Sequence, residues 1–166
     1  MVKEDQSEGE DSTGEGASVR FPPPFVALLA LAIGALFEWA VGPLATPLSG
    51  GARFGVGGLL VAGGIALLLA AGSLFRETGQ DPKPWKSSPE IIASGIYRRT
   101  RNPMYLGMGI MQAGLGVLFA CMWIVALVPV TWIVIYWTAI RHEEAYLTDK
   151  FGESYLEYKA SVRRWV

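Results

Sequence analysis

Residues 94–109 decide how this chain folds, and they read SGIYRRTRNPMYLGMG. Arginines stand just before Asn102 and Pro103, and an apolar run without a charged side chain follows. Asn is favoured immediately before a helix. Pro is favoured as the first helical residue, because its φ is already helical and its missing N–H would be unpaired there anyway. The pattern predicts a helix that begins at Pro103 and enters a membrane.

The start of this predicted helix is also a candidate anion site. Its first turn exposes unpaired N–H groups and carries partial positive charge, which attract a carboxylate or a phosphate. A collar of three arginines, Arg98, Arg99 and Arg101, adds positive charge beside it. We expect this arginine collar to mark both the membrane boundary and a binding site.

The apolar run after the collar is too long for one membrane span. Residues 104–140 contain no charged side chain. A single helix of this length would measure about 55 Å, whereas the hydrocarbon core of a bilayer is about 30 Å thick. Two spans joined by a tight turn fit better, and we expect that turn between Phe119 and Trp123.

Two further spans precede this hairpin. Residues 25–41 are apolar except for Glu38, and residues 54–75 carry no charge at all. Both lengths fall within the roughly 17–25 residues that cross a bilayer. Glu38 either reaches the far interface or marks a functional site, as intramembrane carboxylates often do. We therefore expect an all-α protein with four transmembrane helices. Its expected partners include the lipid bilayer.

The two ends of the chain are polar. Residues 1–24 are rich in Ser, Gly and Glu, which predicts a disordered acidic tail ahead of a membrane domain at residues 25–166. The tail is acidic where a signal peptide would be basic. Beyond residue 140, apolar side chains at helical spacing predict an amphipathic C-terminal helix, and they are Leu147, Phe151, Tyr155 and Tyr158. We expect Gly152 to interrupt this helix, which either lies on the membrane or folds back over the central loop.

Basic residues predict the orientation. The loop at residues 76–102 holds six of them and the segment at residues 141–166 holds five, whereas the other short loops offer only Arg53. Basic loops stay in the cytoplasm, so we expect both termini, Trp85 and any site between these segments to be cytoplasmic in an inner cell membrane protein.

Several classes of function are excluded or not expected. The single histidine, His142, excludes a multi-histidine metal site, and the single cysteine, Cys121, excludes an intramolecular disulfide. We expect no metal and no nucleic-acid partner. No strand followed by G-x-G-x-x-G is present, which excludes a soluble methyltransferase of the Rossmann type.

Two carboxylates follow the last span directly, Glu143 and Glu144, just after Arg141. Adjacent side chains on a helix point about 100° apart, so one carboxylate can line a site while the other meets the loop arginines. The alternative is a charge cluster that only ends the span.

Two motifs resemble a known group of enzymes. Residues 95–107, GIYRRTRNPMYLG, resemble the G-x-Y-x-x-x-R-[HN]-P-x-Y-x-G signature of the isoprenylcysteine carboxyl methyltransferase-like and phospholipid methyltransferase families. Residues 143–165, EEAYLTDKFGESYLEYKASVRRW, resemble their second signature, E-E-x-x-L-x-x-x-F-G-x-x-Y-x-x-Y. The order and spacing of the motifs agree, and the resemblance covers residues 54–166.

The resemblance implies an integral membrane enzyme that moves a methyl group from S-adenosylmethionine to a lipophilic small-molecule acceptor. It implies catalytic roles for Glu143, Glu144 and Arg141. The implied cofactor-binding residues are Tyr97, Arg98, Arg101, Asn102, Pro103, Tyr105, Leu106, Gly107, Gly109, Glu143, Glu144, Tyr155 and Tyr158. The helix start and arginines suit the cofactor's carboxylate, and a glutamate suits its cationic or hydroxylated part.

Two departures from the family pattern bear on the acceptor. Asn102 stands where the eukaryotic carboxyl methyltransferases have histidine, and Ala139 stands where they tend to have arginine. A prenylated protein is therefore a disfavoured substrate, and a lipid, thiol, carboxylate or amine acceptor stays open. The alternatives are an NADPH-dependent membrane reductase of the sterol reductase type and a non-catalytic membrane protein on the same scaffold.

Overall fold

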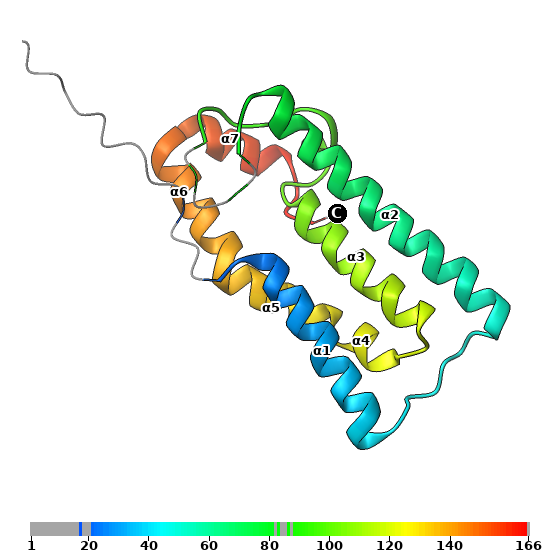
Figure 1. Cartoon of the computed structure of the whole chain (residues 1–166). Helices are drawn as coiled ribbons and strands as arrows, with labels where there is room; N and C mark the ends of the chain where they lie inside the picture. Colours follow the sequence, from blue (N-terminus) through cyan, green and yellow to red (C-terminus); the bar gives the residue numbers. More distant parts are fainter. Residues whose placement is uncertain (1–16, 18–20, 82, 84–85, 87, 166) are drawn as a thin grey trace, which may run out of the picture.

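The computed structural model describes residues 17, 21–81, 83, 86 and 88–165. In this part of the chain every regular element is a helix, which confirms the all-α expectation (Figure 1). The elements are α1 (Pro23–Val41), α2 (Gly50–Glu77), η1 (Gly95–Arg98), α3 (Pro103–Leu118), α4 (Met122–Ala126), α5 (Val128–Ile135), η2 (Tyr136–Ile140), α6 (Arg141–Phe151) and α7 (Glu153–Ser161). The predictions made for Trp85 and for most of the acidic tail fall outside the described residues.

Three helices are long and apolar enough to cross a membrane: α1, α2 and the helix Met122–Phe151, which comprises α4, α5, η2 and α6. The fourth expected span, α3, is apolar but has only 16 residues. Only 17% of the apolar windows of α1 and α2 is buried inside the protein, so most of their apolar side chains face outward. Such surfaces are stable in hydrocarbon rather than in water.

The predicted hairpin turn is confirmed. Helix α3 ends at Leu118 and the next helix begins at Met122. Ala120 adopts a φ of 57°, a left-handed conformation that lets the chain reverse within three residues. The amide N–H of Cys121 donates to the carbonyl of Gly116 and closes the turn.

Glycines bring α2 and α3 into backbone contact. A Cβ atom on Gly64 of α2 would lie 2.7 Å from the carbonyl oxygen of Gly107 on α3. A Cβ atom on Gly114 of α3 would lie 2.7 Å from the amide nitrogen of Val61 on α2. Small residues allow membrane helices to pack this closely. Helix α1 instead packs against α3, α4 and α5.

The C-terminal segment folds back over the central loop rather than away from it. Gly152, at a φ of 52°, separates α6 from α7, which confirms the predicted interruption. After α7 the chain returns to the start of α3, where the Arg101 amide donates to the Arg163 carbonyl over 3.0 Å. Figure 1 shows this red segment beside the first turn of α3.

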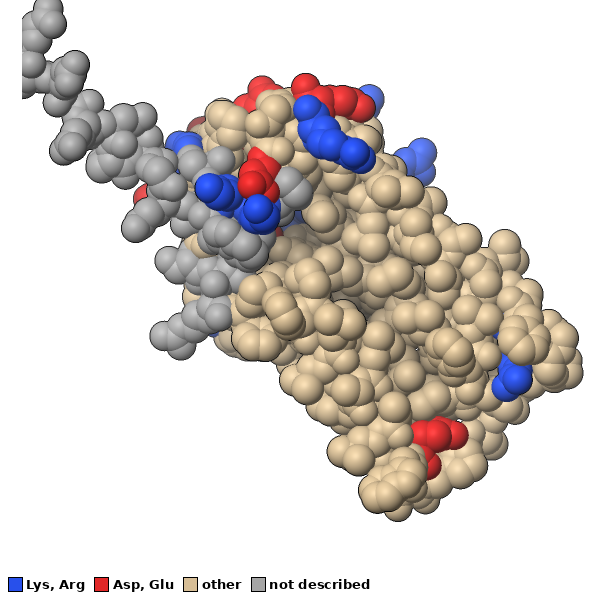
Figure 2. Space-filling view, viewed as in Figure 1, with Lys and Arg blue, Asp and Glu red and all other residues tan. Residues whose placement is uncertain are grey.

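Charged side chains gather at one end of the molecule. Figure 2 shows Lys, Arg, Asp and Glu clustered over α6, α7 and the central loop, while the flanks of the helices are almost free of charge. This distribution is typical of a protein whose helices lie in a bilayer and whose polar end lies in water.

Candidate functional site

The start of α3 and the start of α6 face each other across two adjoining cavities of about 130 and 90 Å³. The cavities share Phe75, Ser88, Tyr97, Arg101, Asn102, Glu143 and Leu147, and we call them together the site. The first opens toward the first turn of α3 and the second toward α7. The two sequence motifs thus meet at one place.

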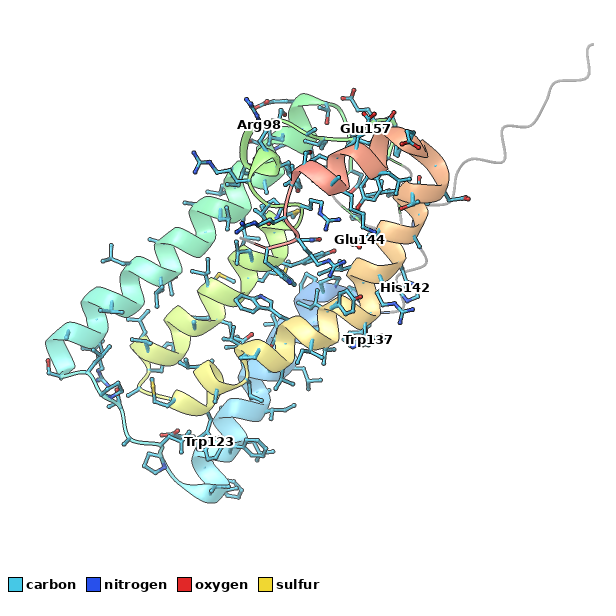
Figure 3. All side chains as sticks on the ribbon, turned by 180° about the vertical axis from the view of Figure 1, so that it is seen from behind. Arg98, Trp123, Trp137, His142, Glu144 and Glu157 are labelled. Carbon is cyan, nitrogen blue, oxygen red and sulfur yellow. The ribbon has the colours of Figure 1, made fainter. Side chains whose placement is uncertain are left out.

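Glu144 is the electrostatic centre of the site's second cavity. Its carboxylate accepts from Arg101 Nη1 over 3.0 Å and from Arg164 Nε and Nη2 over 2.8 and 2.9 Å. Lys159 Nζ lies 3.5 Å away. Burial raises the pKa of Glu144, but the hydrogen bonds from Arg164 and the charges of Arg101, Arg164 and Lys159 outweigh it, so the pKa is lowered. The ionised carboxylate ties α6 to the arginine collar and to the C-terminal segment (Figure 3).

Glu143 points to the other side of α6 and has a different environment. Its carboxylate accepts a hydrogen bond from the hydroxyl of Tyr105. The charge-free part of the helix Met122–Phe151 ends at Ile140, and we therefore place α6, which begins at Arg141, outside the bilayer. Burial raises the pKa of Glu143 to about 7, with the Tyr105 hydrogen bond opposing the rise and the charge of Glu144 adding to it. Glu143 therefore holds or releases a proton near neutral pH.

Asn102 precedes α3 as predicted, but its side chain does not bond to the first turn of the helix. Its amide Nδ2 donates to the Arg164 carbonyl over 3.2 Å, and the Thr100 hydroxyl donates to the same oxygen over 3.1 Å. The C-terminal segment draws the side chain away from the helix. Among the described residues no side chain caps the first turn of α3, whose N–H groups stay available beside the first cavity.

Two buried donors in the site have no partner among the described residues: Nε of Arg101 and Nε2 of Gln80. Both residues line the second cavity. A buried donor without a partner costs about 1–3 kcal/mol, so a ligand with acceptor atoms would be stabilised here. Sequence reasoning missed Gln80, because a polar residue in an irregular loop carries no signal of its own.

Three tyrosines form part of the wall of the second cavity. The Tyr158 hydroxyl donates to the Tyr97 carbonyl over 2.8 Å, and the Tyr155 and Tyr158 rings lie 6.1 Å apart. Burial raises the pKa of Tyr97, Tyr155 and Tyr158 above the usual value, so all three stay neutral. The wall is aromatic and uncharged.

Some of the arginines expected in the site do not reach it. Of the collar, only Arg101 lines the cavities, while Arg98 and Arg99 are exposed. Arg141 is also exposed, and its guanidinium stacks over the ring of Trp137, 4.5 Å from the ring centroid. Arg164, which sequence reasoning had counted only as a basic tail residue, takes the place beside Glu144 instead.

Some of the predicted cofactor residues on α3 also line the cavities, and others do not. Pro103 and Tyr105 line the first cavity. Gly107 instead packs against Gly64 of α2, and Gly109 packs against the Trp132 ring of α5. Leu106 is half-buried and lines neither cavity. The glycines serve close helix packing in this structure.

Comparisons with known proteins identify the family of the chain. The family model described as phospholipid methyltransferase matches residues 52–154. The protein-S-isoprenylcysteine O-methyltransferase of Xenopus laevis is 34% identical over 96 residues, which are 57% of this chain and 32% of that protein. This chain thus matches about a third of the length of that relative. No solved structure matches the chain.

Proposed function

Since this chain belongs to the phospholipid methyltransferase family, we propose that it transfers a methyl group from S-adenosylmethionine to a lipophilic small-molecule acceptor. The observation that carries the proposal is the meeting of the two motifs around one site. Tyr105 contacts Glu143 there and Arg101 contacts Glu144. Two buried donors beside them have no acceptor among the described residues.

The residues present fit the proposed cofactor. The uncapped first turn of α3 suits a carboxylate, and the unpaired donors of Arg101 and Gln80 suit carboxylate, hydroxyl or ring-nitrogen acceptors. The carboxylate of Glu143 suits an ammonium or a ribose hydroxyl, and the tyrosine wall suits an adenine ring. When bound, S-adenosylmethionine supplies a methyl group already activated on a sulfonium.

The protein's share of the reaction is then positioning and proton handling. A half-buried site between α3 and α6 aligns the reactants and excludes water, which accounts for much of the acceleration of such transfers. A carboxylate or thiolate acceptor needs no base. An amine acceptor must lose its proton before it reacts, because only the neutral amine has a lone pair to attack the methyl group.

We assign the site to the predicted residues that line the cavities, with Gln80 added. These are Gln80, Tyr97, Arg101, Asn102, Pro103, Tyr105, Glu143, Glu144, Tyr155 and Tyr158. Arg98, Leu106, Gly107, Gly109 and Arg141 stay predictions from the family resemblance alone.

We further propose that residues 25–166 form one membrane domain with four spans, α3 being the short one. The basic residues at one end of the molecule support a cytoplasmic site and a cytoplasmic α7 in the inner cell membrane. At about 24 Å, α3 would cross most of the hydrocarbon core.

The test uses the purified full chain in detergent. Adenosylhomocysteine should raise the thermal midpoint, because a ligand that binds only the folded state stabilises it, whereas NADPH should not. Labelled methyl groups from S-adenosylmethionine should then appear in a membrane lipid extract. A midpoint that responds to NADPH and not to adenosylhomocysteine would contradict the proposal and favour the reductase alternative.

A further inference from the structure

One residue ahead of α1 lies in the site. Ala17 lines the first cavity, which Arg101 and Glu143 also line, and its exposed fraction is only 3%. The acidic, Ser- and Gly-rich composition of residues 1–24 predicts a solvated segment, in which an alanine would be exposed. The burial of Ala17 beside the site is therefore a feature that composition does not explain.

The start of α1 brings residue 17 within reach of the first cavity. Val26, one turn into α1, belongs to the same buried cluster as Tyr105, which lines that cavity. The rings of Phe21 and Phe25 lie 6.1 Å apart, edge to face, and hold the chain ahead of α1 against the helix. Ala17 is four residues from Phe21, a distance of at most about 14 Å along an extended chain. The place where α1 begins thus keeps Ala17 close to the cavity.

The first cavity is lined by distant parts of the chain. The central loop contributes Asp81 and Lys83, whose side chains form an ion pair over 3.5 Å. Helix α3 contributes its first turn, and α6 contributes the side that carries Glu143. Ala17 is the one lining residue that comes from ahead of α1 in the described part of the chain. A ligand that fills this cavity would therefore contact Ala17 as well as the residues of the two motifs.

The groups that line the first cavity suit an amino acid. The N–H groups in the first turn of α3 suit a carboxylate, and the carboxylate of Glu143 suits an ammonium. The proposed cofactor carries both groups at its amino-acid end. Tyr155 and Tyr158, which suit its adenine, line the second cavity, and Ala17 does not. The two ends of the cofactor are thus matched to different cavities, and Ala17 belongs to only one of them.

We propose that Ala17 is a specificity-determining residue, which forms a wall of the subsite for the amino-acid end of S-adenosylmethionine. This inference rests on the proposed function, because it takes the first cavity as the place of that end. It extends the site to a segment outside residues 52–154, which the family model matches. The small side chain leaves about 130 Å³ open, whereas a large one would fill much of this space.

The test compares adenosylhomocysteine with methylthioadenosine, which carries the same adenosine but no amino acid. Calorimetry measures both dissociation constants with the purified full chain in detergent. Ala17→Phe should weaken the binding of adenosylhomocysteine at least about tenfold, because the larger side chain takes the room of the amino-acid end. It should leave the binding of methylthioadenosine unchanged. Equal effects on the two compounds, or no effect on adenosylhomocysteine, would overturn the inference.

Two further variants serve as controls. Ala160→Phe adds the same ring at an exposed position of α7, outside both cavities, and should change neither dissociation constant. Ala17→Gly removes only the methyl group and should keep the binding of adenosylhomocysteine. A weakening by Ala17→Gly as large as that by Ala17→Phe would overturn the role of side-chain size.

A labelling experiment tests the burial of position 17 by a separate readout. Ala17→Cys, in a Cys121→Ser background, should react with an impermeant maleimide at least about tenfold more slowly than Lys86→Cys, because position 86 is exposed. Adenosylhomocysteine should slow the reaction at position 17 further, whereas methylthioadenosine should not. Equal rates at positions 17 and 86 would overturn the inference.

The inference and the proposed function fail in different ways. If the wild type binds adenosylhomocysteine but Ala17→Phe weakens both compounds alike, the wall at Ala17 fails and the proposed function stands. If the wild type binds neither compound, the proposed function fails, and the subsite fails with it.

Discussion

Helix α3 has two faces that are built by opposite means. Toward α2, glycines bring the backbones together, and a Cβ atom at Gly64 or Gly114 would meet backbone atoms at 2.7 Å. Toward α1, long flexible side chains border a cavity of about 290 Å³. The tight face fixes the position of the collar and the site, and the loose face leaves room beside them. One helix thus carries a closely packed face and, on another side, a loosely packed one.

The largest effect is expected at the tight face. Gly64→Leu forces a side chain against the Gly107 carbonyl, where no flexible atom can yield. We expect a loss of at least about 3 kcal/mol in unfolding free energy, seen as little folded protein after purification. Gly63→Leu is the neighbouring control, because a Cβ atom there meets nothing within 4 Å, and it should purify normally. Equal yields of the two variants would show that the close contact at Gly64 does not limit the size of the side chain there.

The next effect lies in the site that the tight face positions. Glu144→Gln removes the charge between Arg101 and Arg164, and the loss of stability should stay below the about 3–5 kcal/mol of a fully buried pair, because Arg164 and Lys159 are partly exposed. Methyl transfer should fall at least a hundredfold, about 2.7 kcal/mol of transition-state stabilisation, and the thermal midpoint should drop. Glu157→Gln, exposed on α7 (Figure 3), should change neither quantity. Normal turnover in Glu144→Gln would show that the charge cluster around Glu144 takes no part in methyl transfer.

Glu143 should matter for binding more than for folding. Adenosylhomocysteine carries an ammonium, so its binding should tighten as pH rises through the Glu143 pKa of about 7, where the carboxyl loses its proton. Glu143→Gln should abolish this pH dependence and lower methyl transfer at least roughly tenfold, about 1.4 kcal/mol. Calorimetry one unit above and one unit below that pKa measures the binding. An unchanged pH dependence in the variant would assign it to another group.

The smallest effect on stability is expected at the loose face. Ala27→Phe adds a large side chain where the apolar cavity among α1, α2 and α3 provides space, so the thermal midpoint should change by the equivalent of no more than about 0.5 kcal/mol. A collapse of stability as large as that of Gly64→Leu would mean that the two faces are equally tight.

Features set by neighbouring residues were predictable from the sequence. Pro103 begins α3 and Gly152 breaks the last helix, because each depends on local conformational preferences. The divergence of Glu143 and Glu144 likewise follows from the helical repeat. These rules act within a few residues and need no knowledge of the fold.

Features set by distant partners were not predictable. The Asn102 side chain binds a carbonyl 62 residues away, and no local pattern announces that choice over helix capping. Arg164 and Gln80 enter the site only because the C-terminal segment and the end of α2 converge on it. A glycine motif has the same sequence whether its backbone contacts a ligand or another helix. Only the structure shows that Gly109 packs against Trp132.

The return of residues 163–165 to the collar has a consequence for biosynthesis. The ribosome makes the collar and the hairpin first, and Arg164 and Trp165 emerge some 60 residues later to meet Glu144 and Trp132. A nascent chain can therefore occupy the bilayer while its site is still open. Stalling translation before residue 163 would yield an inserted chain in which Glu144 has Arg101 but lacks Arg164. Maturation of the site then waits for the synthesis of residues 163–165, after membrane insertion has been decided.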